Sequence, residues 1–255
     1  NRTDQELAHI HGASSDQAER AMALAHNAFI SWSTRPVSER AQLLFNLAEQ
    51  LRKRRDQATA LICLEVGKPL PEADADVAEA IDFCEYYARQ ALVLQSPKPM
   101  QSNIPGESNT LRYTARGAAV VIAPWNFPLA ILAGMTAAAV VVGNTVIMKP
   151  AEQSSAIGQL LMQAIQAAGF PKAVVQFLPG RGETIGAQLV SDPRTTIVAF
   201  TGSMDVGLKI IQAAGTTDRT QAQVRRVICE MGGKNAIIVD DDADLDEAVY
   251  GVVKS

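Results

Sequence analysis

The sequence predicts an α/β fold, in which a parallel sheet with flanking helices follows an N-terminal helical region. Residues 14–94 carry apolar side chains at helical spacing, and from Ala118 onward short apolar segments rich in β-branched residues alternate with helical stretches. Strands of this kind, alternating with helices, are typical of a parallel sheet that is covered on both faces. Residues 95–110, rich in Pro, Ser, Asn and Gln, are predicted to form a loop between the two regions.

The N-terminal region is predicted to contain three helices, each marked by an apolar stripe. Pro36 opens the second helix, and the charged run 52–56 is interpreted as the solvated end of that helix rather than a nucleic-acid contact. Gly67, Pro69 and Pro71 interrupt the pattern before the third helix. The three stripes consist of Ala18, Met22, Ala25 and Phe29, then Leu43, Leu44, Leu47 and Leu51, and finally Val77, Ile81, Cys84 and Tyr87.

The second region is predicted to form a Rossmann-like sheet. Residues 110–114 alternate in strand fashion ahead of it. Beyond it, Asp244 is predicted to cap a further helix whose apolar residues recur at helical spacing. The predicted strands cover residues 118–123, 145–148, 174–178, 196–200 and 227–229, with helices near 128–142, 154–168, 183–190 and 204–214.

Composition argues against several classes of protein. The chain has 255 residues, of which 47% are hydrophobic, so it can bury a sizeable core. A formal net charge of −4 with interspersed signs gives no electrostatic footprint for nucleic acid. No apolar run reaches the roughly 20 residues that a membrane span needs. The polar first segment does not resemble a secretory signal.

The cysteines and histidines argue against a disulfide framework, a metal site and a His-dependent nucleophile. The cysteines have unrelated spacings, which fits a reducing cytoplasm, and we expect a cytoplasmic protein without a metal ion. The histidines all lie near the start of the chain, far from every motif below. These residues are Cys63, Cys84 and Cys229, and His9, His11 and His26.

A glycine-rich segment follows the third predicted strand and opens a helix. Gly180, Gly182 and Gly186 give the spacing Gly-x-Gly-x-x-x-Gly, one residue longer than the common dinucleotide fingerprint. The position suits a nucleotide phosphate, because helix N-termini at the carboxyl ends of parallel strands offer free N–H groups. A tight turn with close helix packing explains the glycines equally well.

Two other strand ends carry polar side chains. Lys149 and Glu152 follow the second strand, where a dinucleotide fold places the acidic residue that binds the ribose hydroxyls. Glu152 would also repel a 2′-phosphate, which favours NAD over NADP. The alternative is an exposed lysine and a glutamate favoured by the helix dipole. Ser203 ends the fourth strand and can either donate to a phosphate or cap the next helix.

Two further residues suit acid–base and oxyanion chemistry. In the segment PWNFP, Pro124 and Pro128 restrict the backbone around Asn126, which makes the side chain of Asn126 a pre-organised amide donor. Glu230 ends the last strand before a Gly-Gly pair, a position that suits a general base. The alternative for Glu230 is a carboxylate that merely serves the turn.

Five segments in order resemble the aldehyde dehydrogenase superfamily in content and spacing, over nearly the whole chain. The resemblance implies that a cysteine thiolate attacks an aldehyde, that Asn126 stabilises the oxyanion, that hydride passes to NAD, and that Glu230 activates the hydrolytic water. The segments are PWNFP, GNTVIMKPAE, PGRGETIG, FTGS and EMGGK. The implied cofactor-binding residues are Lys149 and Glu152 at the adenosine ribose, Trp125 and Ser203 near the phosphates, Gly182 and Gly186 against the cofactor, and Ile122, Val206 and Met231 around it.

The segment from Gly67 to Gln90 is similar to the glutamate γ-semialdehyde (1-pyrroline-5-carboxylate) dehydrogenases of proline catabolism. This resemblance implies that Glu72 faces the ammonium group of the substrate and that Phe127 lines the aldehyde tunnel. A carboxylate is a sound partner for an ammonium group. The alternative for Glu72 is favourable placement at a helix start. Succinate semialdehyde or betaine aldehyde is the rival substrate.

The resemblance also implies an incomplete enzyme. The nucleophilic cysteine of the family lies a few dozen residues beyond the position of Glu230, past Ser255, and Cys229 is expected to point to the opposite face of its strand. We therefore expect a cofactor-binding portion that is inactive alone, with Asn1 and Ser255 as truncated ends. The parent is expected to form a homo-oligomer or to belong to a bifunctional chain with a proline dehydrogenase. A non-catalytic nucleotide-binding or assembly module is the alternative.

Four parts of the chain are expected on the same basis. Residues 1–103 form the helical part of the NAD-binding domain, and residues 104–116 begin a bridging hairpin used in oligomerisation. Residues 117–230 form the Rossmann-like core, and residues 231–255 begin the catalytic domain.

Overall fold

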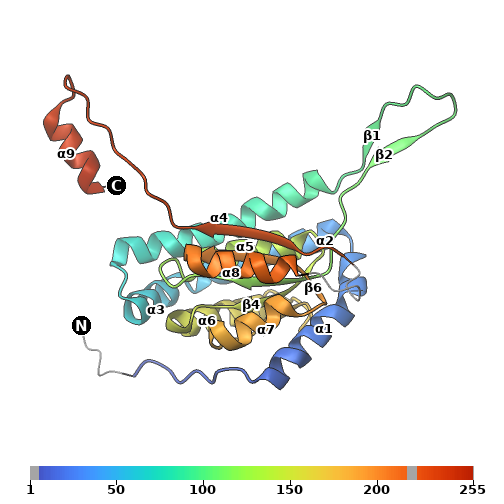
Figure 1. The fold of residues 1–255 in the computed structure, drawn as a ribbon, viewed down its shortest axis with the longest axis horizontal. Helices are drawn as coiled ribbons and strands as arrows, with labels where there is room; N and C mark the ends of the chain where they lie inside the picture. Colours follow the sequence, from blue (N-terminus) through green and yellow to red (C-terminus); the bar gives the residue numbers. More distant parts are fainter. Residues whose placement is uncertain (1–5, 217–222, 255) are drawn as a thin grey trace.

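The computed structural model describes residues 6–216 and 223–254 of the chain. A parallel sheet lies at its centre with the strand order β5-β4-β3-β6-β7 (Figure 1). The expected ends at Asn1 and Ser255 lie outside the described residues. The strands are β3 (Ala118–Ile122), β4 (Thr145–Lys149), β5 (Val175–Phe177), β6 (Thr195–Gly202) and β7 (Arg226–Met231). The sequence placed all five within three residues of these bounds.

Helices cover both faces of the sheet, because the side chains of the central strand β3 alternate between two apolar clusters. Ala119 and Val121 join the larger cluster with helices α2 to α6, whereas Ala118 and Val120 pack with α1 and α7 on the other face. Burial of both faces explains the absence of a polar alternation in the central strands β3 and β4, whereas the edge strand β7 alternates between exposed and half-buried positions. The helices that follow the first strand of the sheet are α5 (Ala130–Val141), α6 (Ser155–Ala167), α7 (Ala187–Ser191) and α8 (Met204–Gly215).

The N-terminal region contains one helix more than the sequence predicted. The second helix ends at Lys53, and after Arg54 a separate helix begins, in place of a solvated helix end. The helix α3 buries only Ala58, Thr59 and Ile62, so its apolar stripe is too short to be recognised. The helices are α1 (Ser15–Ser33), α2 (Val37–Lys53), α3 (Arg55–Val66) and α4 (Leu70–Leu94). Pro71 lies in the first turn of α4, where a proline is tolerated.

A two-stranded hairpin projects from the body of the molecule (Figure 1). Strand β1 (Lys98–Met100) pairs antiparallel with β2 (Asn109–Leu111), although the sequence predicted a loop at β1 and a strand only from residue 110. All six residues of the two strands are exposed. With neither face buried, the strands carry no apolar alternation that a sequence could reveal.

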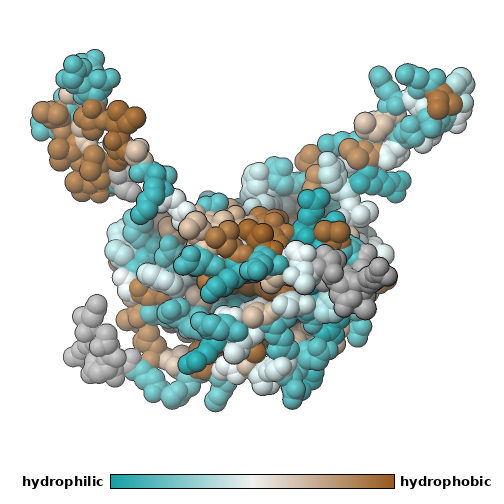
Figure 2. All heavy atoms as spheres, viewed as in Figure 1, coloured by the Kyte–Doolittle hydropathy of each residue, from teal (hydrophilic) through white to brown (hydrophobic). Residues whose placement is uncertain are grey.

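The chain beyond β7 extends away from the body and ends in α9 (Leu245–Lys254). Asp244 caps this helix as predicted, because its Oδ1 accepts hydrogen bonds from Asp246 N at 2.9 Å and Glu247 N at 3.1 Å. Figure 2 shows apolar side chains gathered on α9, and no residue of this helix is buried. Among the described residues, no helix combines the length and the apolar character that crossing a bilayer requires.

Candidate functional site

A large cleft lies at the carboxyl ends of the strands, where the order of the sheet changes direction. From β3 the chain adds β4 and β5 on one side and then crosses to add β6 and β7 on the other. Neighbouring loops diverge at such a point, which leaves a crevice for a ligand. The cleft has a volume of about 980 Å³. That is at the upper end of the ~300–1,000 Å³ typical of ligand pockets.

Ten of the predicted site residues line this cleft. The parallel register explains their proximity, because Ile122 pairs with both Lys149 and Phe200, and Thr201 pairs with Glu230. The predicted residues in the cleft are Ile122, Trp125, Asn126, Lys149, Glu152, Gly182, Ser203, Val206, Glu230 and Met231. Gly186 lies beside the cleft, next to the side chain of Lys149.

Lys149, Glu152 and Gly182 form a connected polar cluster. Glu152 Oε1 accepts hydrogen bonds from Gly182 N at 2.6 Å and from Lys149 Nζ at 3.3 Å, and Lys149 Nζ also donates to Pro150 O at 2.9 Å. Lys149 is buried, not exposed as the structural alternative required. The side chain of Glu152 remains 46% exposed, so its carboxylate can reach a ligand in the cleft.

Burial and charge shift both titrating groups of this cluster. Burial lowers the pKa of Lys149, against the opposing effect of Glu152. Burial alone would raise the pKa of Glu152, but backbone hydrogen bonds and the charge of Lys149 outweigh it, so the pKa of Glu152 is lowered. Glu152 is therefore held as an anion with one N–H donor and one ammonium group already in place.

The three glycines after β5 differ in their surroundings. A Cβ atom at Gly180 would lie 2.8 Å from Ile185 Cγ1, so packing within the chain requires this glycine. At Gly182 the nearest atom would be Glu152 Oε1 at 3.8 Å, and at Gly186 it would be Lys149 Cδ at 3.6 Å, both ordinary contacts. Packing therefore explains Gly180 but not Gly182 or Gly186. The last two begin and end the π-helical turn η2 (Gly182–Gly186).

Ser203 caps helix α8. Its Oγ accepts a hydrogen bond from Val206 N at 3.4 Å, which is the capping role that the sequence left open. Both Ser203 and Val206 are exposed to the cleft. The hydroxyl hydrogen of Ser203 is not used by this cap, so capping and donation to a ligand are compatible.

The loop that carries Asn126 lies at one end of the cleft. Asn126 is exposed and lines the same cleft as Lys149, Ser203 and Glu230, rather than being buried in packing. Trp125 is also exposed. Phe127 and Glu72 do not line the cleft. Phe127 lies on the same loop beneath the ammonium group of Lys68, and Glu72 is exposed on the first turn of α4.

Glu230 and Cys229 point to opposite faces of β7, as expected for adjacent residues of a strand. Cys229 packs with Val227 and Met231 against the cluster of Phe200 and Ile210, and burial raises the pKa of its thiol. Glu230 is exposed and lines the cleft. Cys84 is buried in the core and Cys63 packs against it, so none of the three cysteines lines the cleft.

Several lining residues were not predicted. Apart from alanine, proline and glycine positions, they are Gln153, Arg181, Glu183, Thr184, Phe200 and Thr201. Each lies within two residues of a predicted residue or of the end of a strand, so the rule that ligands bind at strand ends could have found them. Lys68, which contacts the Asn126 loop from the segment between α3 and α4, carried no such signal.

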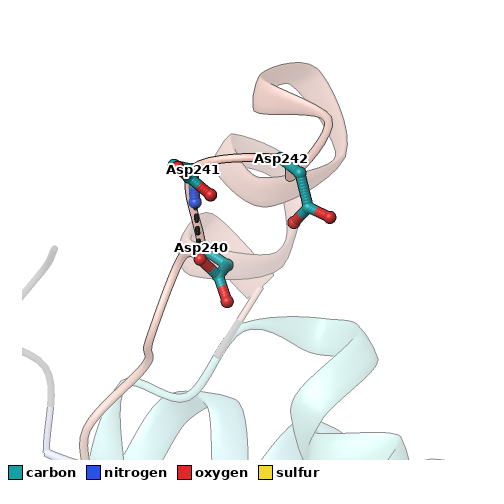
Figure 3. Close-up of side chains that lie close together, drawn as sticks. All are labelled: Asp240, Asp241 and Asp242. Atoms are coloured by element: carbon teal, nitrogen blue, oxygen red, sulfur yellow. Dashed lines mark hydrogen bonds between the residues drawn. The ribbon is translucent and has the colours of Figure 1, made fainter.

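The described residues contain one acidic group with metal-like proximity, in the segment that leads to α9. Asp240, Asp241 and Asp242 are all exposed, and their carboxylates lie close together (Figure 3). Within this group, Asp241 N donates a hydrogen bond to Asp240 Oδ1 at 2.8 Å. Exposed carboxylates without further ligands do not define a metal site.

Comparison with known proteins identifies the family to which the chain belongs. The model of the aldehyde dehydrogenase family matches residues 1–255. A 1-pyrroline-5-carboxylate dehydrogenase of Bacillus mycoides is 47% identical over 95% of this chain and 47% of its own length. A solved 1-pyrroline-5-carboxylate dehydrogenase from Thermus with bound NAD has a TM-score of 0.92 and 49% identity, over 95% of this chain and 47% of its own.

A larger solved protein is similar as well. Proline utilization A from Bdellovibrio bacteriovorus, inactivated by N-propargylglycine, has a TM-score of 0.93 and 52% identity, over 95% of this chain and 25% of its own. The chain thus spans about half the length of the two dehydrogenases. These relatives bear out the fold and the resemblance seen in the sequence.

Proposed function

Because the chain belongs to the aldehyde dehydrogenase family, we propose that it forms the NAD-binding part of a dehydrogenase that oxidises L-glutamate γ-semialdehyde to L-glutamate. The observation that carries this proposal is the single cleft that holds Asn126, Lys149, Glu152 and Glu230 together. The similar 1-pyrroline-5-carboxylate dehydrogenases support the substrate and its place in proline catabolism.

The cleft suits a dinucleotide. Glu152 offers an anionic acceptor to ribose hydroxyls while Lys149 and Gly182 N fix its position. Gly182 and Gly186 leave space that a Cβ atom would fill, so a pyrophosphate can approach the backbone closely. Ser203 and Trp125 would face the phosphates, and Ile122, Val206 and Met231 would pack around the cofactor. NAD bound there would accept the hydride.

The chemistry of this chain's own residues is oxyanion binding and proton transfer. The Asn126 side-chain amide would donate to the aldehyde oxygen as negative charge builds up on it. The Glu230 carboxylate would take the proton of the hydrolytic water. No cysteine lines the cleft, so the nucleophilic thiol would come from a further segment of the whole protein.

The substrate proposal rests on two residues outside the cleft. Glu72 would pair with the ammonium group of the substrate and Phe127 would line the path of the aldehyde. Both are exposed, Phe127 on the Asn126 loop and Glu72 in the first turn of α4.

The remaining expectations are part of the same proposal. The projecting hairpin overlaps the bridging segment expected at 104–116, which supports assembly into a homo-oligomer. Residues 1–103, 117–230 and 231–255 would be the helical part, the cofactor core and the start of the catalytic domain. Proline utilization A, of which this chain matches only a quarter, supports a larger bifunctional parent as the other arrangement. Cytoplasmic localisation stays a prediction.

Titration calorimetry of the chain with NAD and NADP tests the cofactor. NADP should bind at least about 10-fold more weakly than NAD, since about 1.4 kcal/mol of repulsion from Glu152 is enough for that ratio. The Glu152→Gln variant should reduce the ratio of the Kd of NADP to the Kd of NAD. Failure of the wild-type chain to bind either dinucleotide would refute the proposal.

Turnover by the full-length protein tests the substrate. The value of kcat/KM should be highest for glutamate γ-semialdehyde among the three aldehydes considered, which include succinate semialdehyde and betaine aldehyde. Glu72→Gln should reduce this preference, whereas Glu79→Gln, at an exposed position on the same helix, should not. A preference for an aldehyde without an ammonium group rejects the substrate, and NAD binding without turnover of any aldehyde favours a non-catalytic module.

A further inference from the structure

The nearly buried ammonium group of Lys68 binds the loop that carries Asn126. Lys68 lies between α3 and α4, and its side chain is only 10% exposed. Its Nζ atom donates to Asn126 O at 3.0 Å and to Asp76 Oδ2 at 3.1 Å, and lies 3.5 Å from the centre of the Phe127 ring. One cation therefore contacts the backbone of one proposed functional residue and the side chain of the next.

Asp76 anchors this cation and also holds the far end of the loop. Its side chain has no exposed area, and its Oδ1 accepts a hydrogen bond from Ala130 N at 2.7 Å. Ala130 is the first residue of α5, so the carboxylate binds a free N–H group at that helix start. Lys68 and Asp76 thus fix the loop at Asn126 O and at Ala130 N, four residues apart.

The prolines of the loop leave a freedom that this pair removes. Pro124 and Pro128 fix their own φ angles, and Pro128 also biases Phe127 toward extended backbone. Neither ring fixes the plane of the peptide between Asn126 and Phe127. The hydrogen bond from Lys68 to the backbone carbonyl of Asn126 fixes that peptide plane. It thereby also fixes the direction in which the side chain of Asn126 leaves the backbone.

A buried ion pair is a poor source of net stability, because the cost of removing both charges from water offsets their attraction. We therefore assign to the Lys68–Asp76 pair the role of fixing the geometry of a loop that must hold a hydrogen-bond donor in place. Gly67 makes the position possible. It adopts φ 72°, in the left-handed region, ends α3 and turns the chain so that Lys68 reaches the loop.

We propose that Lys68, which is paired with Asp76, is a positioning residue that sets the direction of the Asn126 side-chain amide and the orientation of the Phe127 ring. This inference rests on the proposed function, in which Asn126 donates to the oxyanion. Lys68 acts only through the loop, because its donors are directed at Asp76 and at the main chain of Asn126.

A double-mutant cycle in the full-length enzyme tests the inference. Asn126→Ala should lower kcat about 100-fold, the usual loss for one oxyanion donor. Lys68→Met keeps the aliphatic stem and removes the charge, and should lower kcat about 10-fold, with the Kd of NAD within about twofold of wild type. Because Lys68 acts through Asn126, the double variant should be no slower than Asn126→Ala by more than about twofold.

Three controls separate this role from general destabilisation. Lys172→Met removes an exposed lysine far from the cleft and should leave kcat unchanged. Lys68→Arg keeps a cation over the ring and should recover most of the lost rate. If Lys68→Met does not fold, Asp76→Asn is the alternative variant. It keeps an acceptor for Ala130 N, weakens the ion pair that holds Lys68, and should show the same selective loss of kcat.

The outcomes are distinguishable. A wild-type kcat for Lys68→Met, or a double variant about 1,000-fold slower than wild type because the two losses multiply, overturns the inference while the proposed function stands. A wild-type enzyme that neither binds NAD nor oxidises an aldehyde overturns the proposed function itself.

Discussion

The glycines after β5 allow one question to be tested sharply, namely whether they serve packing or a ligand. We consider Gly182→Ala and compare it with Gly180→Ala, two residues earlier in the same segment. The new methyl group meets Ile185 Cγ1 at 2.8 Å in the second variant, but only Glu152 Oε1 at 3.8 Å in the first. The two variants therefore differ in strain although the chemical change is the same.

The expected free energies follow from these contacts. Ile185 is 4% exposed and cannot move aside easily, so Gly180→Ala should lose about 1–3 kcal/mol of unfolding free energy, the usual cost of overpacking. Gly182→Ala meets no clash and has no positive φ. It should retain wild-type stability or gain about 0.4–1 kcal/mol through the reduced entropy of the unfolded chain.

Binding should show the reverse order. Gly182 lines the cleft, so a methyl group there occupies space that the pyrophosphate of NAD would use, and a 10-fold rise in Kd corresponds to about 1.4 kcal/mol. Urea unfolding gives the stability and calorimetry gives the Kd, with Gly251→Ala on α9 as a helical control that has no neighbour within 4 Å. Wild-type NAD affinity in Gly182→Ala, or a loss of stability equal to that of Gly180→Ala, would refute the reasoning.

Three shorter predictions concern individual side chains, two at the cleft and one in the helical core. The pKa of Glu152 is lowered from its ordinary value of 4.5, so its carboxylate contributes stability above that pH which is lost as the pH falls through the folded pKa; the urea midpoint of Glu152→Gln should lack this acid-side decline. Ser203→Ala removes the cap of α8 and should cost about 1 kcal/mol in urea unfolding, whereas Ser31→Ala on the surface of α1 should cost little. Burial raises the pKa of Cys84 to about 12, so in the native chain at pH 8 mass spectrometry should find iodoacetamide on Cys63 before Cys84; equal rates would contradict the burial.

The sheet could be predicted from the sequence because β3 is apolar over its whole length, and β4, β6 and β7 each contain at least three consecutive apolar residues. Val120 and Val121 face opposite apolar clusters, and both side chains are buried, so an apolar residue is needed at both positions. Elements without a buried face could not be predicted. Strand β1 is exposed throughout and pairs only with β2, and α3 contributes too few buried residues to reveal a period.

The strand-end side of the cleft, where we propose that the cofactor binds, could be predicted from the sequence for a related physical reason. Lys149, Ser203 and Glu230 each end or follow a strand, and parallel register brings such residues to one edge of the sheet. The structure adds that Lys149 is buried rather than exposed and that Ser203 caps a helix while remaining exposed to the cleft; the binding roles of both residues stay predictions.

The aldehyde side depends on contacts that no local pattern contains. Lys68 and Asn126 are 58 positions apart, and the Asp76 carboxylate reaches Ala130 N across 54 positions. These residues come into contact because α4 packs on α5. The other side of the cleft is instead brought together by the register of the strands. Weakening the contact of Lys68 and Asp76 with the Asn126 loop should consequently impair turnover while leaving the affinity for NAD intact, because Lys149, Glu152 and Gly182 lie outside that contact.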